Sequence, residues 1–252
     1  MRKTTPLLLV LLLMLGVLAS STRYQQSTKA SSGHKFDEHI RESPLFFFED
    51  KIQILATKTN DQQDRLNQQN PLWEDIETAI YAVDGFWKTH WNEYFNVPYW
   101  PPRLEPYYGN NNPKCGGIYS PMAENAYYCG PNNYIAWDMN FLSSMYEDPR
   151  LGDASIYLVI AHEWGHAVQY QVYGSLSSSV ETELQADCLA GAALRGAIND
   201  GVLIEEPGDQ DEIFNNLVRV ADKWGNPRSH GSARERNLAF QTGENGGVPA
   251  CF

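Results

Sequence analysis

Basic residues are scarce in this 252-residue chain, which has 19 Lys and Arg against 31 Asp and Glu and a formal charge of −12 at pH 7. Nucleic acids and anionic membrane surfaces are bound through clustered Lys and Arg, which neutralise phosphate groups. The charge balance therefore argues against both partners and leaves open a peptide or cationic substrate. A hydrophobic content of 42% with 20% charged residues is enough for one sizeable core, and it excludes collagen-like, coiled-coil and fully disordered chains.

Long apolar runs are also scarce. After Arg2 and Lys3, the near-continuous apolar stretch Leu7–Ala19 has 13 residues, whereas a membrane-spanning helix needs about 20. The pattern predicts that residues 1–20 are a cleaved signal peptide. The alternative is an uncleaved N-terminal anchor, which would be the only contact with a membrane. Both interpretations place the folded part outside the cytoplasm, secreted or periplasmic, where disulfides persist.

The chain has only four cysteines, and no C-x-x-C spacing among them, so a cysteine zinc site or thioredoxin-like chemistry finds no support. Four cysteines allow three pairings. We favour Cys115–Cys129, which flank a loop containing Gly and Pro, and Cys188–Cys251, which would tie the C-terminus to a helix. The alternative for Cys188 is a buried thiol.

The remaining sequence divides into a polar linker with short ordered segments at 21–70 and a folded domain at 71–252. Apolar residues spaced by three and four predict a long helix over 71–95. Pro, Gly and Asn then interrupt short runs over 97–138, which predicts a small sheet that includes Tyr134–Asp138. Further helices are expected at 154–173, 178–198, 209–224 and 232–243. Three of them are expected to begin at a capping pair: Ser178 and Glu181, Asp209 and Glu212, and Ser232 and Glu235.

The segment His162-Glu163-Trp164-Gly165-His166 lies within the predicted helix 154–173. Residues four apart share a helix face about 6 Å apart along the axis, so both imidazoles are able to bind one metal ion. Glu163 then stands beside the open coordination position, where its carboxylate accepts a proton from water. The pattern predicts a catalytic metal site.

A third ligand is expected from the next helix, where Glu183 and Asp187 lie four residues apart. One carboxylate would bind the metal and the other would hydrogen-bond the far nitrogen of a ligand imidazole; the spacing leaves open which does which. Two histidines, one carboxylate and a water form the catalytic zinc arrangement. The alternative is that Glu181 and Glu183 are first-turn acids that favour the helix dipole. Gly165 and the small residues after Asp187 allow the two helices to approach closely.

These residues resemble a known family. His162–His166 followed by Glu183–Cys188 is similar to the gluzincin pattern H-E-x-x-H…E-x-x-A-D, and more narrowly to the neutral zinc metallopeptidases of bacteria. The resemblance covers about residues 80 to 252 and also includes Cys115-Gly116, Tyr128-Cys129 leading to Tyr134–Asp138, Ser229–Ser232 and Glu235-Arg236.

The resemblance implies an α+β, zincin-like fold in which a small antiparallel or mixed sheet packs on the active-site helix and the C-terminal half is mainly helical. It implies one Zn²⁺ per chain with His162, His166 and Glu183 as ligands. Glu163 would be the general base, and Asp187 would hydrogen-bond a ligand histidine. In gluzincins a later histidine often hydrogen-bonds the oxyanion, which makes His230 a candidate catalytic residue. The alternative for His230 is an ordinary loop histidine beside a helix start.

The predicted function is a zinc metallopeptidase, a hydrolase that cleaves a peptide or protein substrate. The substrate would add as an extended strand to an exposed edge at Tyr134–Asp138. One alternative is a non-catalytic, zinc-holding peptide-binding module of the cell envelope, although such a module has no need of Glu163. Two others are a zinc hydrolase acting on another amide, such as a wall crosslink, and a purely structural zinc site.

Overall fold

The computed structural model describes residues 1–3, 71–223 and 230–252. The predicted linker at 21–70, and the predicted targeting segment apart from its first three residues, lie outside this range. Strand β1 (Arg2–Lys3) pairs antiparallel with β5 (Leu203–Ile204), and the Met1 ammonium lies 2.7 Å from Asp153 Oδ2. None of the helices in the described ranges combines the length and apolar character that crossing a membrane requires.

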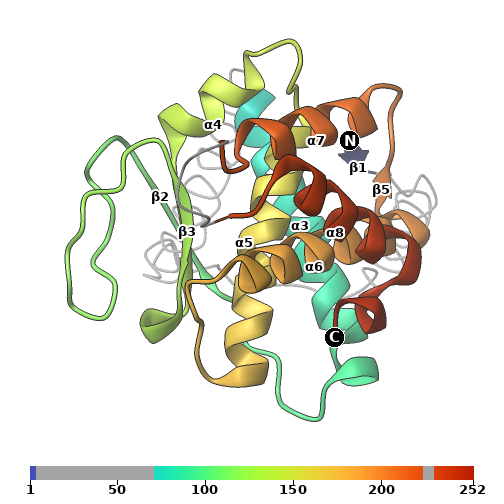
Figure 1. Cartoon of the computed structure of the whole chain (residues 1–252), viewed down its shortest axis with the longest axis horizontal. Helices are drawn as coiled ribbons and strands as arrows, with labels where there is room; N and C mark the ends of the chain where they lie inside the picture. Colours follow the sequence, from blue (N-terminus) through green and yellow to red (C-terminus); the bar gives the residue numbers. More distant parts are fainter. Residues whose placement is uncertain (4–70, 224–229) are drawn as a thin grey trace, which may run out of the picture. The chain divides into compact units, whose positions relative to one another are not determined.

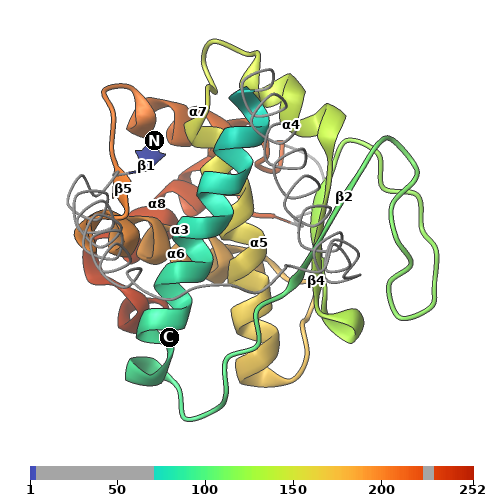
Figure 2. The ribbon, with the colours of Figure 1, turned by 180° about the vertical axis from the view of Figure 1, so that it is seen from behind.

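Helix α3 (Pro71–Tyr94) confirms the predicted long helix. Proline suits the first helical position because it has no N–H to leave unpaired. Ile76, Val83, Trp87 and Trp91 form one apolar face and are buried. That face packs along α5 (Ala154–Tyr173) and α6 (Val180–Asn199), as seen from behind in Figure 2.

A three-stranded sheet follows α3, with β2 (Arg103–Tyr107), β3 (Ala126–Cys129) and β4 (Tyr134–Asp138) in the order β2-β4-β3. Strands β2 and β4 are parallel, whereas β3 and β4 are antiparallel. The prediction that Tyr134–Asp138 is an edge strand is therefore wrong, since β4 is the central strand. Its five residues are all buried, as expected for a strand covered on both faces. A mixed sheet with mostly helical content confirms the α+β class.

Two short elements connect the sheet to the helices. The 3-10 helix η2 (Gly130–Asn132) lies between β3 and β4. Helix α4 (Met139–Tyr146), which the sequence did not predict, begins where the Asp138 carboxylate accepts a hydrogen bond from Asn140 N. Helix α5 has the predicted bounds and ends at Gly174, whose φ of +76° favours glycine.

Two of the three predicted capping pairs are wrong. Ser179, not Ser178, caps α6 by accepting from Thr182 N, so Glu181 is not a capping partner. Gly208 precedes α7 (Asp209–Arg219), and Asp209 accepts from Glu206 N instead of capping with Glu212. The predicted end of this helix at Trp224 lies outside the described residues. Ser232 and Glu235 form the predicted capping box of α8 (Ala233–Gly246), which ends three residues later than predicted.

The helices and the sheet are arranged around α5. The sheet packs on one side of α5, and α6 and then α8 lie on the other (Figure 1). Both favoured disulfides are present: Cys115–Cys129 joins the loop before β3 to the last residue of that strand, and Cys188–Cys251 joins α6 to the 3-10 helix η3 (Val248–Cys251). Helix α5 is therefore shared by the sheet and the helical half, and the candidate site lies along it.

Candidate metal centre and active site

Two helices position the predicted metal ligands. His162 and His166 lie one turn apart on α5, and Glu183 lies in the first turn of α6. Gly165 allows the helices to approach, because a Cβ there would lie 2.8 Å from the Ala186 carbonyl oxygen. The close approach predicted from the small residues is thus present, and it brings the two ligand sets together.

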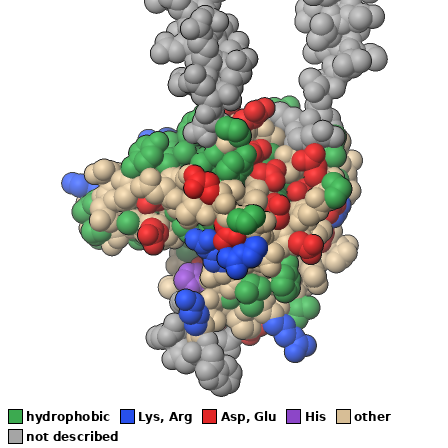
Figure 3. All heavy atoms as spheres, turned by 90° about the horizontal axis from the view of Figure 1, so that it is seen from above, with side chains coloured by type: hydrophobic (Ala, Val, Ile, Leu, Met, Phe, Trp, Pro, Cys, Tyr) green, Lys and Arg blue, Asp and Glu red, His purple; other side chains and the backbone are tan. Residues whose placement is uncertain are grey.

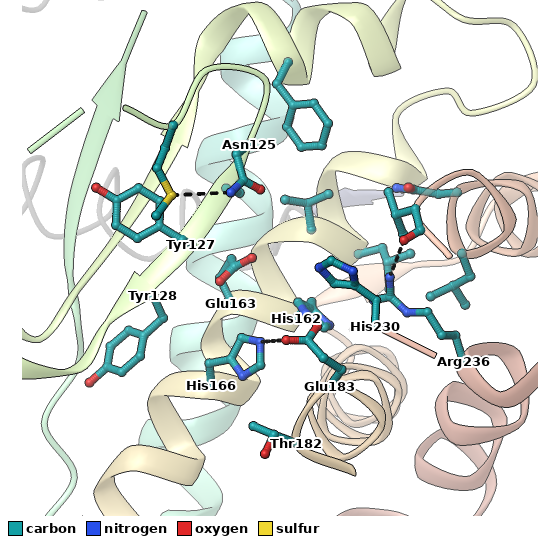
Figure 4. A pocket seen from close by; sticks show the side chains of 18 of the residues that line it. Asn125, Tyr127, Tyr128, His162, Glu163, His166, Thr182, Glu183, His230 and Arg236 are labelled. Atoms are coloured by element: carbon teal, nitrogen blue, oxygen red, sulfur yellow. Dashed lines mark hydrogen bonds and ion pairs between the residues drawn. The ribbon is translucent and has the colours of Figure 1, made fainter. Parts of the chain in front are cut away.

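The three side chains converge through specific atoms (Figure 4). Nε2 of His162 lies 3.3 Å from one carboxylate oxygen of Glu183, and Nε2 of His166 lies 3.5 Å from the other. One ligand atom from each residue lies within 4.8 Å of the other two. Of the two carboxylates between which the spacing left the choice open, Glu183 faces both imidazoles, whereas Asp187 lies against His162 Nδ1.

Asp187 contacts the His162 nitrogen that points away from the site. This carboxylate is fully buried and lies 2.9 Å from His162 Nδ1. It also accepts two hydrogen bonds of 2.8 Å from the Arg236 guanidinium on α8. A buried charge needs such pairing. The arrangement leaves His162 Nε2 to face the centre of the site.

Gln169 holds His166 in the same way. Its Oε1 lies 2.8 Å from His166 Nδ1, and its Nε2 donates to the Thr182 carbonyl oxygen at 2.7 Å. Nε2 of His166, like that of His162, thus faces the site. Both imidazoles are held through Nδ1, which is the usual role of the outer partners of metal-bound histidines.

Sequence reasoning assigned no role to Arg236 or Gln169, although a signal existed for each. Gln169 continues the 162, 166 series by three residues and so lies on the same helix face. Arg236 occupies the buried face of α8 together with Phe240 and Gly243. A charged or amide side chain at a core position requires a buried partner.

The charges of the site are coupled. Burial opposes a charge on His162, but the hydrogen bond and charge of Asp187 outweigh it and raise its pKa to about 10. Burial and the neighbouring His162 charge lower the pKa of His166 to about 4. Burial opposes the charge of Glu183 as well, yet His162 lowers its pKa to about 2. In the absence of a metal ion, His162 is therefore the positively charged imidazole and His166 the neutral one, and a metal ion that uses both Nε2 atoms must displace the proton on His162 Nε2.

Glu163 lies beside this triad and is 6% exposed. Burial is the main cause that raises its pKa to about 7. Within the described residues, its Oε2 has no hydrogen-bond partner. A carboxylate with a pKa near neutrality and a free oxygen is suited to accept and return a proton.

A pocket of about 690 Å³ opens over these residues. Its walls come from β3 and the loop before it, α4, α5 and the loop after it, the start of α6, α7, and the side chains of His230 and Arg236. The His230 side chain is 52% exposed, and its Nδ1 lies 3.6 Å from Asp222 Oδ1. The structure thus brings His230 to the same pocket as the triad and Glu163. Glu235, in contrast, is occupied by the α8 capping box.

The donor set fits a zinc ion. Two imidazole nitrogens and one carboxylate oxygen match the ligands of catalytic zinc sites, which use three protein ligands and keep one position open. Each imidazole has its other nitrogen satisfied by Asp187 or Gln169. The residues present therefore fit such an ion.

The chain is similar to curated bacterial proteins that are described as uncharacterized. YpfJ of Escherichia coli strain K12, described as an uncharacterized protein, is 30% identical over 178 residues, which cover 60% of this chain and 61% of that protein. The uncharacterized protein Rv2575 of Mycobacterium tuberculosis strain H37Rv is 27% identical over 198 residues, or 67% of this chain and 65% of that protein. The chain thus spans about three fifths of the length of these curated relatives. No solved structure matches it significantly.

The comparison with protein families matches residues 45–251 to one family. Its description, "Putative neutral zinc metallopeptidase", implies zinc and agrees with the donor set of the triad. The match covers most of the chain and includes every element that contributes to the pocket. The chain belongs to this putative neutral zinc metallopeptidase family.

Proposed function

We propose that this protein is a zinc-dependent peptidase that hydrolyses peptide bonds with Glu163 as general base. One observation carries the proposal: the triad of His162, His166 and Glu183 lies in a pocket next to a buried carboxylate that has a free oxygen. A site that only held metal would gain nothing from such a carboxylate. The pocket size also suits a peptide, since ligand sites are commonly 300–1,000 Å³.

The proposed chemistry assigns one task to each residue. One Zn²⁺ per chain, held by the triad, supplies Lewis acidity that lowers the pKa of water and polarises a carbonyl. Glu163 takes the proton from the attacking water and returns it to the leaving amine. His230, at the mouth of the pocket, donates a hydrogen bond to the developing oxyanion. Asp187 keeps His162 in the orientation that presents Nε2.

The substrate is proposed to bind along β3. Within the described residues β3 pairs only with β4, and its residues Ala126, Tyr127 and Tyr128 line the pocket. An extended peptide is able to add to such an edge through its backbone. This replaces the predicted edge at β4 and supports a zincin-like arrangement, in which the outer strand of a sheet packed on the active-site helix borders the cleft. Apolar side chains from three helices form the adjoining wall: Phe141, Leu158, Val159 and Leu217.

A peptide also agrees with the surface charges. On the face of the described chain drawn in Figure 3, acidic side chains are spread widely and basic ones stand in small groups. Such a face offers no continuous surface for a phosphate backbone. The two disulfides support an extracytoplasmic location, because thiols in the cytoplasm are kept reduced.

The test replaces the proposed base. Glu163→Gln keeps the size of the side chain but cannot accept a proton, so we expect kcat/KM on an unfolded casein-like substrate to fall at least about 100-fold. Zinc content, measured by elemental analysis, stays at one per chain because Glu163 is not a ligand. In the same assay, His230→Ala lowers kcat by a smaller factor and leaves zinc content unchanged.

The matched control is Glu181→Gln, an exposed glutamate two residues from Glu183 that lies outside the pocket. It should cleave like the wild type. Wild-type turnover by Glu163→Gln would remove Glu163 from the mechanism. Zinc-loaded wild-type protein that binds peptides but cuts none would instead favour the peptide-binding module.

A further inference from the structure

We propose that Gln169 is a positioning residue that fixes the tautomer of His166, and that the disulfide-linked C-terminal segment anchors it. The proposal rests on His166 being a zinc ligand, as in the proposed function. Gln169 is 1% exposed and lies three residues after His166 on α5. Its amide contacts His166 on one side and α6 on the other.

The orientation of this amide follows from its partners. The Thr182 carbonyl oxygen only accepts hydrogen bonds, so the Gln169 atom 2.7 Å away from it is Nε2. Oε1 therefore faces His166 Nδ1 at 2.8 Å. Since Oε1 also only accepts, Nδ1 must carry the hydrogen. His166 is thereby held as the tautomer with an unprotonated Nε2, the form that binds a metal.

Gln169 is also linked to the C-terminal segment through Gln185. Gln169 Nε2 also donates to Gln185 Oε1 at 3.0 Å, and Gln185 Nε2 donates to the Cys251 carbonyl oxygen at 2.9 Å. That carbonyl again only accepts, so the direction of the whole series is fixed. Cys251 is tied to α6 by its disulfide with Cys188. Backbone carbonyls of Thr182 and Cys251 thus determine which nitrogen of His166 is protonated.

The neutral amide has a physical advantage over a carboxylate here. Three carboxylates, those of Glu163, Glu183 and Asp187, already lie close to the two imidazoles. A fourth negative charge behind His166 would have to be buried without a cation of its own, which is costly. The amide orients the ring and adds no charge. Asp187, in contrast, has Arg236 to balance it.

The first experiment needs no variant. In the zinc-free wild-type protein at neutral pH, ¹⁵N–¹H correlation spectra distinguish the two tautomers of a neutral imidazole. We expect His166 to show a protonated Nδ1 and an unprotonated Nε2. A protonated Nε2 on His166 would overturn the proposal, whether or not the protein cleaves peptides.

The second experiment measures zinc affinity by competition with a chelator. Gln169→Leu removes both sets of contacts, and we expect the zinc dissociation constant to rise about 10- to 100-fold. Gln185→Leu keeps the contact to His166 but removes the anchor, so we expect a smaller rise. Gln169→Glu retains an acceptor for Nδ1 but is unable to donate to Thr182, and it should lie between wild type and Gln169→Leu.

The matched control is Gln171→Leu. Gln171 lies on the same helix and contacts Trp100 N and the Ala167 carbonyl oxygen, away from the triad. We expect its zinc affinity to equal that of the wild type. Unchanged affinity in Gln169→Leu with native circular dichroism would overturn the proposal. Because the readout is metal binding, zinc-binding protein without peptidase activity would refute the proposed function and leave this inference intact.

Discussion

The two sides of α5 are held together by different kinds of contact. On the helical side, backbones pack directly: a Cβ on Gly165 would lie 2.8 Å from Ala186 O, and one on Gly243 would lie 1.8 Å from Cys188 O. The sheet side has short strands whose connecting loops are fixed by hydrogen bonds from side chains to the backbone. The buried carboxylate of Asp138, for example, accepts from the N–H groups of Gly109, Glu124 and Asn140.

The difference matches the demands of the proposed reaction. Metal ligands must stay within a narrow range of distances, and closely packed helices with paired charges provide that rigidity. The strand that would receive a substrate needs a free edge, which a fully packed layer would cover. Glu124, two residues before β3, has a φ of +55°, so the loop at this edge adopts a backbone conformation that few non-glycine residues favour.

The largest expected difference between the two sides of α5 comes from removing each disulfide in turn. Cys188→Ala/Cys251→Ala opens a 63-residue separation and Cys115→Ala/Cys129→Ala a 14-residue one. Chain entropy predicts losses of about 4 and about 3 kcal/mol in the free energy of unfolding. Denaturant titration measures both. We expect only the first pair to weaken zinc binding, because only Cys251 contacts the residues behind His166.

An equal loss of zinc affinity in the two double variants would show that the sheet side supports the metal site as much as the helical side does. The distinction drawn between the helical side and the sheet side of α5 would then be wrong. The expected result, in contrast, separates stability from metal binding, because the two double variants would then differ less in the free energy of unfolding than in zinc affinity.

The next test uses two glycines within helices. Gly165→Ala places a methyl group against the Ala186 backbone, and such overpacking costs about 1–3 kcal/mol. Alanine favours a helix over glycine by about 1 kcal/mol, so the net loss is about 1 kcal/mol. Gly85→Ala on α3 meets nothing within 4 Å and is the control, expected to gain stability. Urea midpoints of the two variants that move in the same direction would contradict direct helix contact at Gly165.

The helical side was largely predictable from the sequence, because its signals are local. The i, i+4 pair of His162 and His166, the apolar face of α3 and the stop at Gly174 all depend on residues a few positions apart. The caps show the limit of such reasoning. Three consecutive serines precede α6, and which of them caps the helix depends on how the chain enters it from α5.

The sheet side and the supports of the ligands were not predictable in the same way. The central position of β4 results from pairing with β2, about 30 residues earlier in the chain, on one side and with β3 on the other. Arg236 and Gln169 acquire their roles only when α8 and α6 dock against α5. Helix α4 has eight residues, too few for a clear period.

The smallest effect is expected from replacing one aspartate by asparagine on each side of α5. Burial, followed by the charge of Asp153, raises the pKa of Asp75 on α3 to about 6 from its ordinary 3.8. The folded protein therefore binds more protons than the unfolded chain between about pH 4 and 6, so the stability due to Asp75 falls as the pH rises through this window. Asp75→Asn should raise stability at pH 7, and solvent screening of this half-buried side chain limits the gain to about 1 kcal/mol.

Asp138→Asn, on the sheet side, is expected to lower stability. The Asp138 carboxylate accepts hydrogen bonds from three backbone N–H groups, and in the variant the amide nitrogen would face N–H donors. Melting temperatures between pH 4 and 8 measure both variants. The advantage of Asp75→Asn over wild type should grow from pH 4 to 7, while Asp138→Asn should melt below wild type at pH 7. If the melting temperatures of wild type and Asp75→Asn instead changed in parallel between pH 4 and 8, the folded protein would not favour the protonated form of Asp75. The Asp75 carboxyl would then be as well solvated as an exposed one, and the prediction would be wrong.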